Sequence, residues 1–95
     1  MYGEKLELLI DGKFRQGSEG KGEDLINPAT EEVLAHLPHA STADLEEALQ
    51  ASQRGFIAWK AKTAQERYVI MSKAANLIEE RKEAIARILT MENGK

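Results

Sequence analysis

Apolar and polar side chains alternate in short runs along residues 1–40, the pattern of β-strands with one buried face. Leu6, Leu8 and Ile10 form the first run. Asp11-Gly12 follows directly and can adopt the positive backbone dihedrals that a tight two-residue hairpin turn requires. The pattern therefore predicts a β-hairpin in which residues 13–15 return as the partner strand.

Residues 17–23 separate this hairpin from a second pair of expected strands. They are rich in glycine and contain no apolar side chain, so they cannot be anchored by burial, and we expect a mobile loop. Extended structure resumes at Leu25-Ile26. Asn27-Pro28 predicts a turn, because proline fixes its own dihedral and disfavours helix at the preceding residue. A further short strand is expected from Val33 to Leu37.

Helical periodicity begins after Ser41-Thr42, either of which can cap the free amides of a first turn. Apolar positions then recur at spacings of three, four and seven, which predicts a helix from about Ala43 to Lys60. The face expected to be buried is formed by Leu45, Ala48, Leu49, Ser52, Phe56 and Trp59.

A second helix is predicted from the capping box Thr63-Ala64-Gln65-Glu66. Its pattern continues without a breaker to Asn93-Gly94, where glycine can end a helix. Such a helix would be roughly 40 Å long, whereas a compact globule of this length has a radius of gyration of about 12 Å. The stripe of Ile70, Leu77 and Ile88 would then need a partner, or the rest of a larger chain, to cover it.

Composition excludes several classes of function. The net charge is −3 and charges of both signs are interspersed, so we expect no nucleic-acid partner. No apolar run is long enough to span a bilayer, and residues 1–5 lack the pattern of a signal peptide, so we expect no membrane partner and a cytoplasmic location. Cysteine is absent, which removes disulfides and the thiolate nucleophile.

The residues that could carry chemistry have structural interpretations that we favour. His36 and His39 could present two imidazoles to a metal, but Pro38 interrupts the segment and no third ligand is evident. The glycines of residues 17–22 suggest a phosphate-binding loop, but Lys21 is followed by glycine instead of Ser or Thr, and no helix begins there. A hairpin loop and ordinary turn histidines explain these features better.

Two further groups are also interpreted as structural. Acidic and basic residues alternate along the second helix at spacings of three or four, which indicates a solvated face instead of an acid/base pair. Trp59 and Phe56 could be an exposed recognition anchor, but their position on the apolar stripe favours packing. On the second helix, the acidic residues of this solvated face are Glu79, Glu80 and Glu83.

The ordered set of motifs nevertheless resembles the aldehyde dehydrogenase superfamily from about Leu8 onward. The motifs are Leu9-Ile10-Asp11-Gly12, Ile26-Asn27-Pro28-Ala29-Thr30, Asp44-Leu45-Glu46-Glu47-Ala48, Trp59, Glu66-Arg67, Lys73-Ala74-Ala75, Leu77-Ile78-Glu79-Glu80-Arg81 and Glu92-Asn93-Gly94-Lys95. Residues 9–14 and 72–81 are similar to succinate-semialdehyde and related bacterial dehydrogenases.

This resemblance implies oxidation of an aldehyde to a carboxylic acid with NAD or NADP. In the family a cysteine thiolate attacks the carbonyl, hydride passes to the nicotinamide, and a glutamate-activated water hydrolyses the thioester. The cysteine, glutamate, oxyanion asparagine and nucleotide-binding units of the family would all lie beyond Lys95. We therefore assign no catalytic and no cofactor-binding residue, and expect these residues alone to be inactive and to bind no cofactor.

The fold implied is an α/β fragment in which residues 1–95 are an incomplete N-terminal part of a Rossmann-like cofactor-binding domain. Strands and turns would occupy residues 1–40 and a helical pair residues 41–95. The resemblance also implies a homodimer or homotetramer. Finally, it implies a monovalent cation site with a backbone carbonyl from Ile26 and a carboxylate from Glu92, which we do not expect to be occupied in this piece alone.

A function of a different class remains open. The uncovered stripe of the second helix could make the chain a stand-alone module that dimerises or binds a partner helix. The two hypotheses differ in what covers that stripe.

Overall fold

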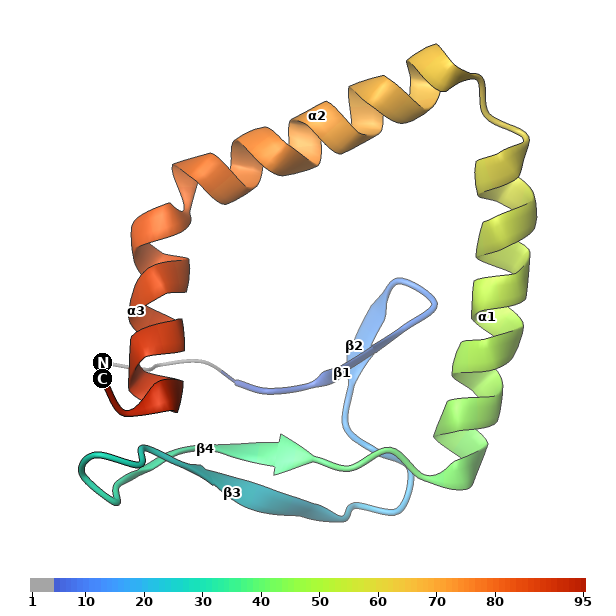
Figure 1. Ribbon diagram of the computed structural model, residues 1–95. Coiled ribbons are helices and arrows are strands. Elements are labelled where there is room, and N and C mark those ends of the chain that lie inside the picture. The colour runs from blue at the N-terminus through green and yellow to red at the C-terminus, as the bar shows by residue number, and fades with distance from the viewer. Residues whose placement is uncertain (1–4) are drawn as a thin grey trace.

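A computed structural model describes residues 5–95 (Figure 1). The prediction that residues 1–5 form no signal peptide therefore lies mostly outside the described residues. Strand β1 (Leu8–Ile10) pairs antiparallel with β2 (Lys13–Arg15). Asp11 and Gly12 have φ values of 52° and 73°, as a hairpin turn of the predicted kind requires. The first hairpin is confirmed.

The second hairpin pairs β3 (Gly22–Ile26) with β4 (Val33–Pro38). At its turn the side chain of Asn27 accepts a hydrogen bond from the Ala29 N–H at 2.9 Å, which confirms the predicted turn. The loop expected over residues 17–23 ends sooner than predicted, because Gly22 and its neighbour Glu23 already pair with β4. Ladder hydrogen bonds come from the backbone and do not require an apolar side chain.

Helix α1 (Thr42–Lys60) begins at Ser41, whose Oγ accepts the Asp44 N–H at 3.1 Å while the Asp44 carboxylate accepts the Ser41 N–H at 2.9 Å. Helix α2 (Ala64–Glu80) begins with the predicted capping box. Thr63 Oγ1 accepts the Glu66 N–H at 3.1 Å, and Glu66 Oε2 accepts the Thr63 N–H at 2.8 Å. Both helix starts therefore satisfy their free amides with side chains.

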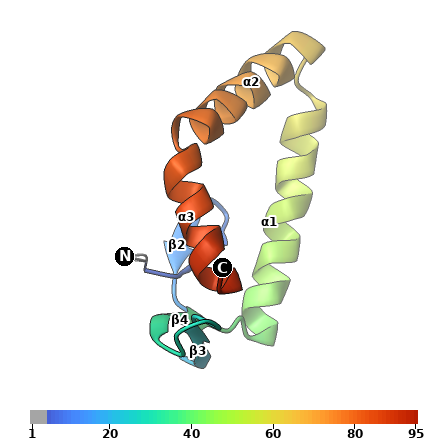
Figure 2. The ribbon, with the colours of Figure 1, turned by 60° about the vertical axis from the view of Figure 1, so that its left-hand side comes forward.

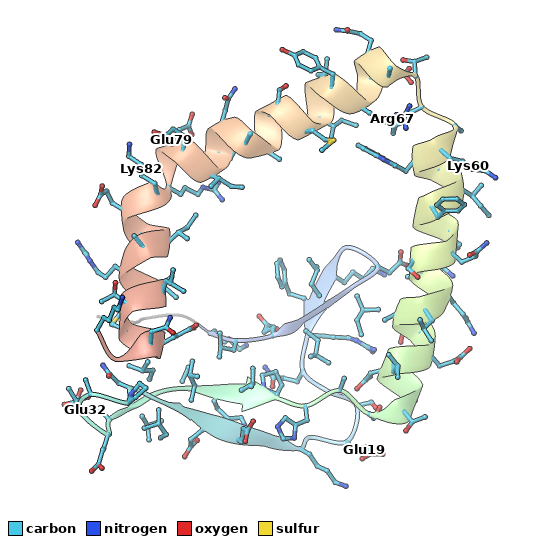
Figure 3. All side chains as sticks on the ribbon, viewed as in Figure 1. Glu19, Glu32, Lys60, Arg67, Glu79 and Lys82 are labelled. Atoms are coloured by element: carbon cyan, nitrogen blue, oxygen red, sulfur yellow. The ribbon has the colours of Figure 1, made fainter. Side chains whose placement is uncertain are left out.

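The prediction of one long second helix is wrong. At Arg81 the backbone takes φ −102° and ψ 10°, and a separate helix, α3 (Lys82–Asn93), continues at an angle to α2 (Figure 1). Residues 79–83 contain neither glycine nor proline, so no local signal marked the bend. Glu79 and Lys82 form an ion pair of 2.8 Å on the outside of this corner (Figure 3). The predicted glycine stop is confirmed, since Gly94 has φ 71°.

The three helices and the β3–β4 hairpin form an open frame, with α1 and α3 on opposite sides, α2 joining them at one end and the hairpin at the other (Figures 1 and 2). The radius of gyration is 16.7 Å, compared with about 12 Å for a compact globule of this length. Among the described residues, Ile10 is the one buried hydrophobic side chain. No helix in residues 5–95 is long and apolar enough to cross a membrane.

The predicted packing of the apolar face of α1 does not occur within this frame. Phe56 is 58% exposed and Leu45 and Leu49 are each 56% exposed, while Trp59 is half-buried. The physical reason is geometric: α1 contacts strand β1, but α2 and α3 turn away from it and leave the rest of the face uncovered. The sequence pattern identified which side of the helix is apolar without specifying what would cover it.

Candidate functional site

The end of α3 lies directly on the turn that follows β3. A Cβ atom added to Gly94 would be 2.9 Å from the backbone nitrogen of Ala29 and 3.1 Å from Cβ of Pro28. Both ribbon views show the C-terminus beside the β3–β4 hairpin (Figures 1 and 2). Glycine is thus required at this position for close approach as well as for its positive φ.

This contact brings together the two elements that carry the candidate cation ligands. Ile26 is the last residue of β3, directly before the turn, and Glu92 is in the last turn of α3, directly before Asn93-Gly94. A backbone carbonyl and a carboxylate are both oxygen donors of the kind that hard cations bind. A pocket opens at the same end of α3, lined by Leu89, Thr90, Asn93 and Lys95.

The histidines form side-chain pairs across the second hairpin. His36 Nδ1 lies 3.3 Å from Asp24 Oδ1, and His39 Nε2 lies 3.4 Å from Glu23 Oε1, with all four side chains largely exposed. Within residues 5–95 no three His, Cys, Asp or Glu side chains are grouped so that they could hold a metal ion. The structure thus favours the interpretation of His36 and His39 as surface residues.

The glycines of residues 17–22 form a turn between strands, as favoured from the sequence. Gly20 N–H donates to the Gly17 carbonyl at 3.1 Å, and the chain then enters β3 instead of a helix. A phosphate-binding loop needs a helix N-terminus to follow it. The described residues therefore do not fit the pyrophosphate of NAD(P), and the sequence has no cysteine to act as a nucleophile.

A buried carboxylate cluster around Asp44 was not identified from the sequence. Asp44 is 1% exposed, and its carboxylate accepts hydrogen bonds from Arg15 Nη2 at 2.8 Å and from the Ser18 and Ser41 N–H groups at 2.9 Å each. Arg15 also donates to Glu47 at 2.9 Å. The cluster joins the end of β2, the turn after it and the start of α1.

Hydrogen bonding to the ionised form sets the acidity of Asp44. The backbone amides of Ser41 and Ser18 lower its pKa from 3.8 to about 2, helped by the Ser41 hydroxyl and by Arg15, and they outweigh burial, which raises it. A carboxylate held in this state accepts hydrogen bonds and supplies no proton, so its role is structural. The spacing Ser41-x-x-Asp44 was the signal that could have indicated a capping box.

Comparison with known proteins decides the family. Residues 14–95 match the Aldehyde dehydrogenase family. The chain belongs to this family. The identification from sequence motifs is confirmed at that level.

Relatives of this aldehyde dehydrogenase chain are much longer than it is. Malonate-semialdehyde dehydrogenase of Halalkalibacterium halodurans is 38% identical over 93 residues, which are 98% of this chain and 19% of that protein. An E. coli NADP-dependent enzyme is 33% identical with a TM-score of 0.91, covering 96% of this chain and 19% of that one. An NAD-dependent benzaldehyde dehydrogenase from Corynebacterium glutamicum is 34% identical with a TM-score of 0.80, covering 85% and 18%.

These likenesses confirm the predicted fold class. The paired strands followed by helices are a small α/β arrangement that matches the N-terminal part of aldehyde dehydrogenase structures. Within this fold class, the expected second helix is divided into α2 and α3, and β3 begins earlier than expected, at Gly22.

Proposed function

We propose that this chain forms the first part of the cofactor-binding domain of an NAD(P)-dependent aldehyde dehydrogenase. Its role there is structural and not catalytic. The observation that carries the proposal is the match of 96% of the chain, at a TM-score of 0.91, to 19% of an NADP-dependent enzyme. The whole enzyme would oxidise an aldehyde to an acid through a cysteine thioester. It would be a cytoplasmic homo-oligomer.

We further propose that its aldehyde substrate carries a carboxylate at its other end. A curated relative acts on malonate semialdehyde, and residues 9–14 and 72–81 resemble succinate-semialdehyde dehydrogenases. Both substrates are short semialdehydes that end in a carboxylate. The cofactor would be NAD or NADP, since one solved relative is named for each.

The structural role explains the uncovered apolar faces. Large hydrophobic side chains are exposed on all three helices, among them Phe56 at 58%, Met71 at 62% and Leu89 at 58%. Removing such surface from water stabilises a fold by about 25 cal/mol per Å². We propose that the remainder of the dehydrogenase chain supplies this burial.

The test is an assay of the purified 95-residue chain with malonate and succinate semialdehydes and either nicotinamide cofactor. The absorbance of the reduced cofactor measures turnover. The full-length malonate-semialdehyde dehydrogenase relative is the positive control. We expect no turnover from the chain alone, because it contains no cysteine and no nucleotide loop. Turnover proportional to chain concentration would contradict the proposal.

We also propose that Ile26 and Glu92 donate oxygens to a monovalent cation in the whole enzyme. The support is the contact of Gly94 with Pro28 and Ala29, which holds α3 against the turn after β3, the two elements that carry Glu92 and Ile26.

In a full-length dehydrogenase carrying this segment, K⁺ or Na⁺ should raise the melting temperature more than a bulky quaternary ammonium ion at equal ionic strength. Glu92→Gln should remove that difference, whereas Glu79→Gln on the exposed corner should keep it. An unchanged response of Glu92→Gln would contradict the site.

The alternative function is a stand-alone interaction module. It is favoured by Ile70, which is 45% exposed on the stripe that continues to half-buried Leu77 and Ile88. Light scattering of the 95-residue chain distinguishes the two. A specific dimer would favour the module, whereas a monomer or non-specific aggregate is expected of a segment whose apolar faces belong against other parts of a larger enzyme.

A further inference from the structure

The dipeptide Asn93-Gly94 at the end of α3 has a reactivity that the proposed function does not use. An asparagine followed by glycine can cyclise spontaneously, because glycine has no side chain to hinder its backbone nitrogen from approaching the amide carbon Cγ. Asn93 is exposed at the last residue of the helix. The same reaction is blocked at Asn27, since the following Pro28 has no N–H.

The hydrogen bond that holds the attacking backbone nitrogen, that of Gly94, is long. The Gly94 N–H donates to the Met91 carbonyl at 3.4 Å, and the Lys95 N–H to the Thr90 carbonyl at 3.1 Å. Terminal turns open at much smaller free-energy cost than interior ones. By contrast, Asn76 lies within α2, where the helix continues on both sides. We propose that Asn93 is a spontaneous deamidation site and that its conversion loosens the contact between α3 and the β3–β4 turn.

The reaction needs only water. When the last turn opens, the Gly94 nitrogen loses its proton and attacks Asn93 Cγ. The new C–N bond closes a five-membered succinimide ring, and the side-chain nitrogen leaves as ammonia. Water then adds to either ring carbonyl and breaks its bond to the Gly94 nitrogen, which regains a proton. The products are aspartate or isoaspartate, and the net change is one water consumed and one ammonia released.

Either product disturbs the contacts that hold the end of α3. Asn93 Nδ2 donates to the Leu89 carbonyl at 2.8 Å, and a carboxylate at that position could only accept. Its negative charge would also lie at the negative end of the helix dipole. Isoaspartate adds a carbon to the main chain directly before Gly94, and so displaces the glycine that lies closely against Pro28 and Ala29.

Trypsin separates the asparagines, so one digest measures all of them. Asn93 falls in the peptide 88–95, Asn76 in 74–81 and Asn27 in 22–54. The 95-residue chain is aged at mildly alkaline pH, and mass spectrometry follows replacement of NH₂ by OH, with isoaspartyl methyltransferase to detect isoaspartate. We expect Asn93 to convert roughly tenfold faster than Asn76, as a terminal turn opens more readily. Equal rates at Asn93 and Asn76 would overturn the site.

The structural consequence is tested with two variants. Asn93→Asp reproduces the charge of one product, whereas Asn93→Gln keeps an amide donor and cyclises poorly. We expect hydrogen exchange in residues 88–95 and 27–29 to be roughly tenfold faster in Asn93→Asp, because the helix end opens more often, and to change less in Asn93→Gln. If Asn93→Asp exchanges like the unchanged chain, the loosening is wrong.

Discussion

Arg15 Nη2 lies 2.8 Å from Asp44 Oδ1 and joins residues that are 29 positions apart in the sequence. The carboxylate is buried at 1% exposure, while the Arg15 side chain is 35% exposed. Since Asp44 also accepts the amides of Ser18 and Ser41, it holds the path of the chain from β2 to α1. The cluster thereby sets the position of α1 relative to the first hairpin.

Replacing Asp44 by asparagine should destabilise this junction. The substitution removes the charge that pairs with Arg15 and places an NH₂ group among hydrogen-bond donors. We expect a lower melting temperature of the helical signal in circular dichroism and faster hydrogen exchange in residues 15–18 and 41–47. Glu47→Gln is the matched control, because Glu47 pairs with the same arginine but is 53% exposed, and such pairs contribute little. Equal effects of the two variants would contradict the central role of Asp44.

Stability should fall at low pH through the same residue. The pKa of Asp44 is about 2 in the folded chain and 3.8 at its ordinary value, so the unfolded chain binds the proton first as pH falls. The stabilisation is therefore present above pH 3.8 and is lost as pH falls through about 2. Urea midpoints measured across this interval should decline in the natural chain and more gently in Asp44→Asn. Parallel curves would show that other carboxylates dominate.

Removal of the Thr63 cap should weaken the start of α2. Thr63→Ala loses the acceptor of the Glu66 N–H, a change that costs about 1 kcal/mol for a helix cap. Hydrogen exchange in residues 64–67 should accelerate. Thr42→Ala is the control, since Thr42 lies inside the first turn of α1 and the cap there is Ser41. Identical exchange in Thr63→Ala and the natural chain would contradict the assigned cap.

Gly17 and Gly55 should respond in opposite directions to alanine. A Cβ on Gly17 would collide with the backbone carbonyl oxygen of His39, so the Gly17→Ala chain must shift its backbone and should melt at lower temperature. A Cβ on Gly55 meets nothing within 4 Å in the middle of α1. Gly55→Ala should therefore stabilise the helix by about 1 kcal/mol. Stabilisation by both substitutions would refute the close approach at Gly17.

Local chemistry in the sequence determined most of the elements and the family. The Asp11-Gly12 turn, the Thr63 capping box and the Gly94 stop each depend on neighbouring residues, so their physical causes were visible in the sequence. The order of short motifs likewise indicated the aldehyde dehydrogenase family, to which residues 14–95 belong. Such features involve interactions within a few residues along the chain.

Tertiary structure alone decided the features that depend on distant partners. The bend at Arg81 has no local breaker, and it directs α3 so that Gly94 meets Pro28. The Asp44 cluster needs Arg15 and Ser18, whose approach cannot be inferred from spacing. The apolar face of α1 was visible as a periodic pattern, yet whether Phe56 is covered depends on where other elements pack. Periodicity reports which residues share a face, whereas contacts between faces arise only when the whole chain is arranged in space.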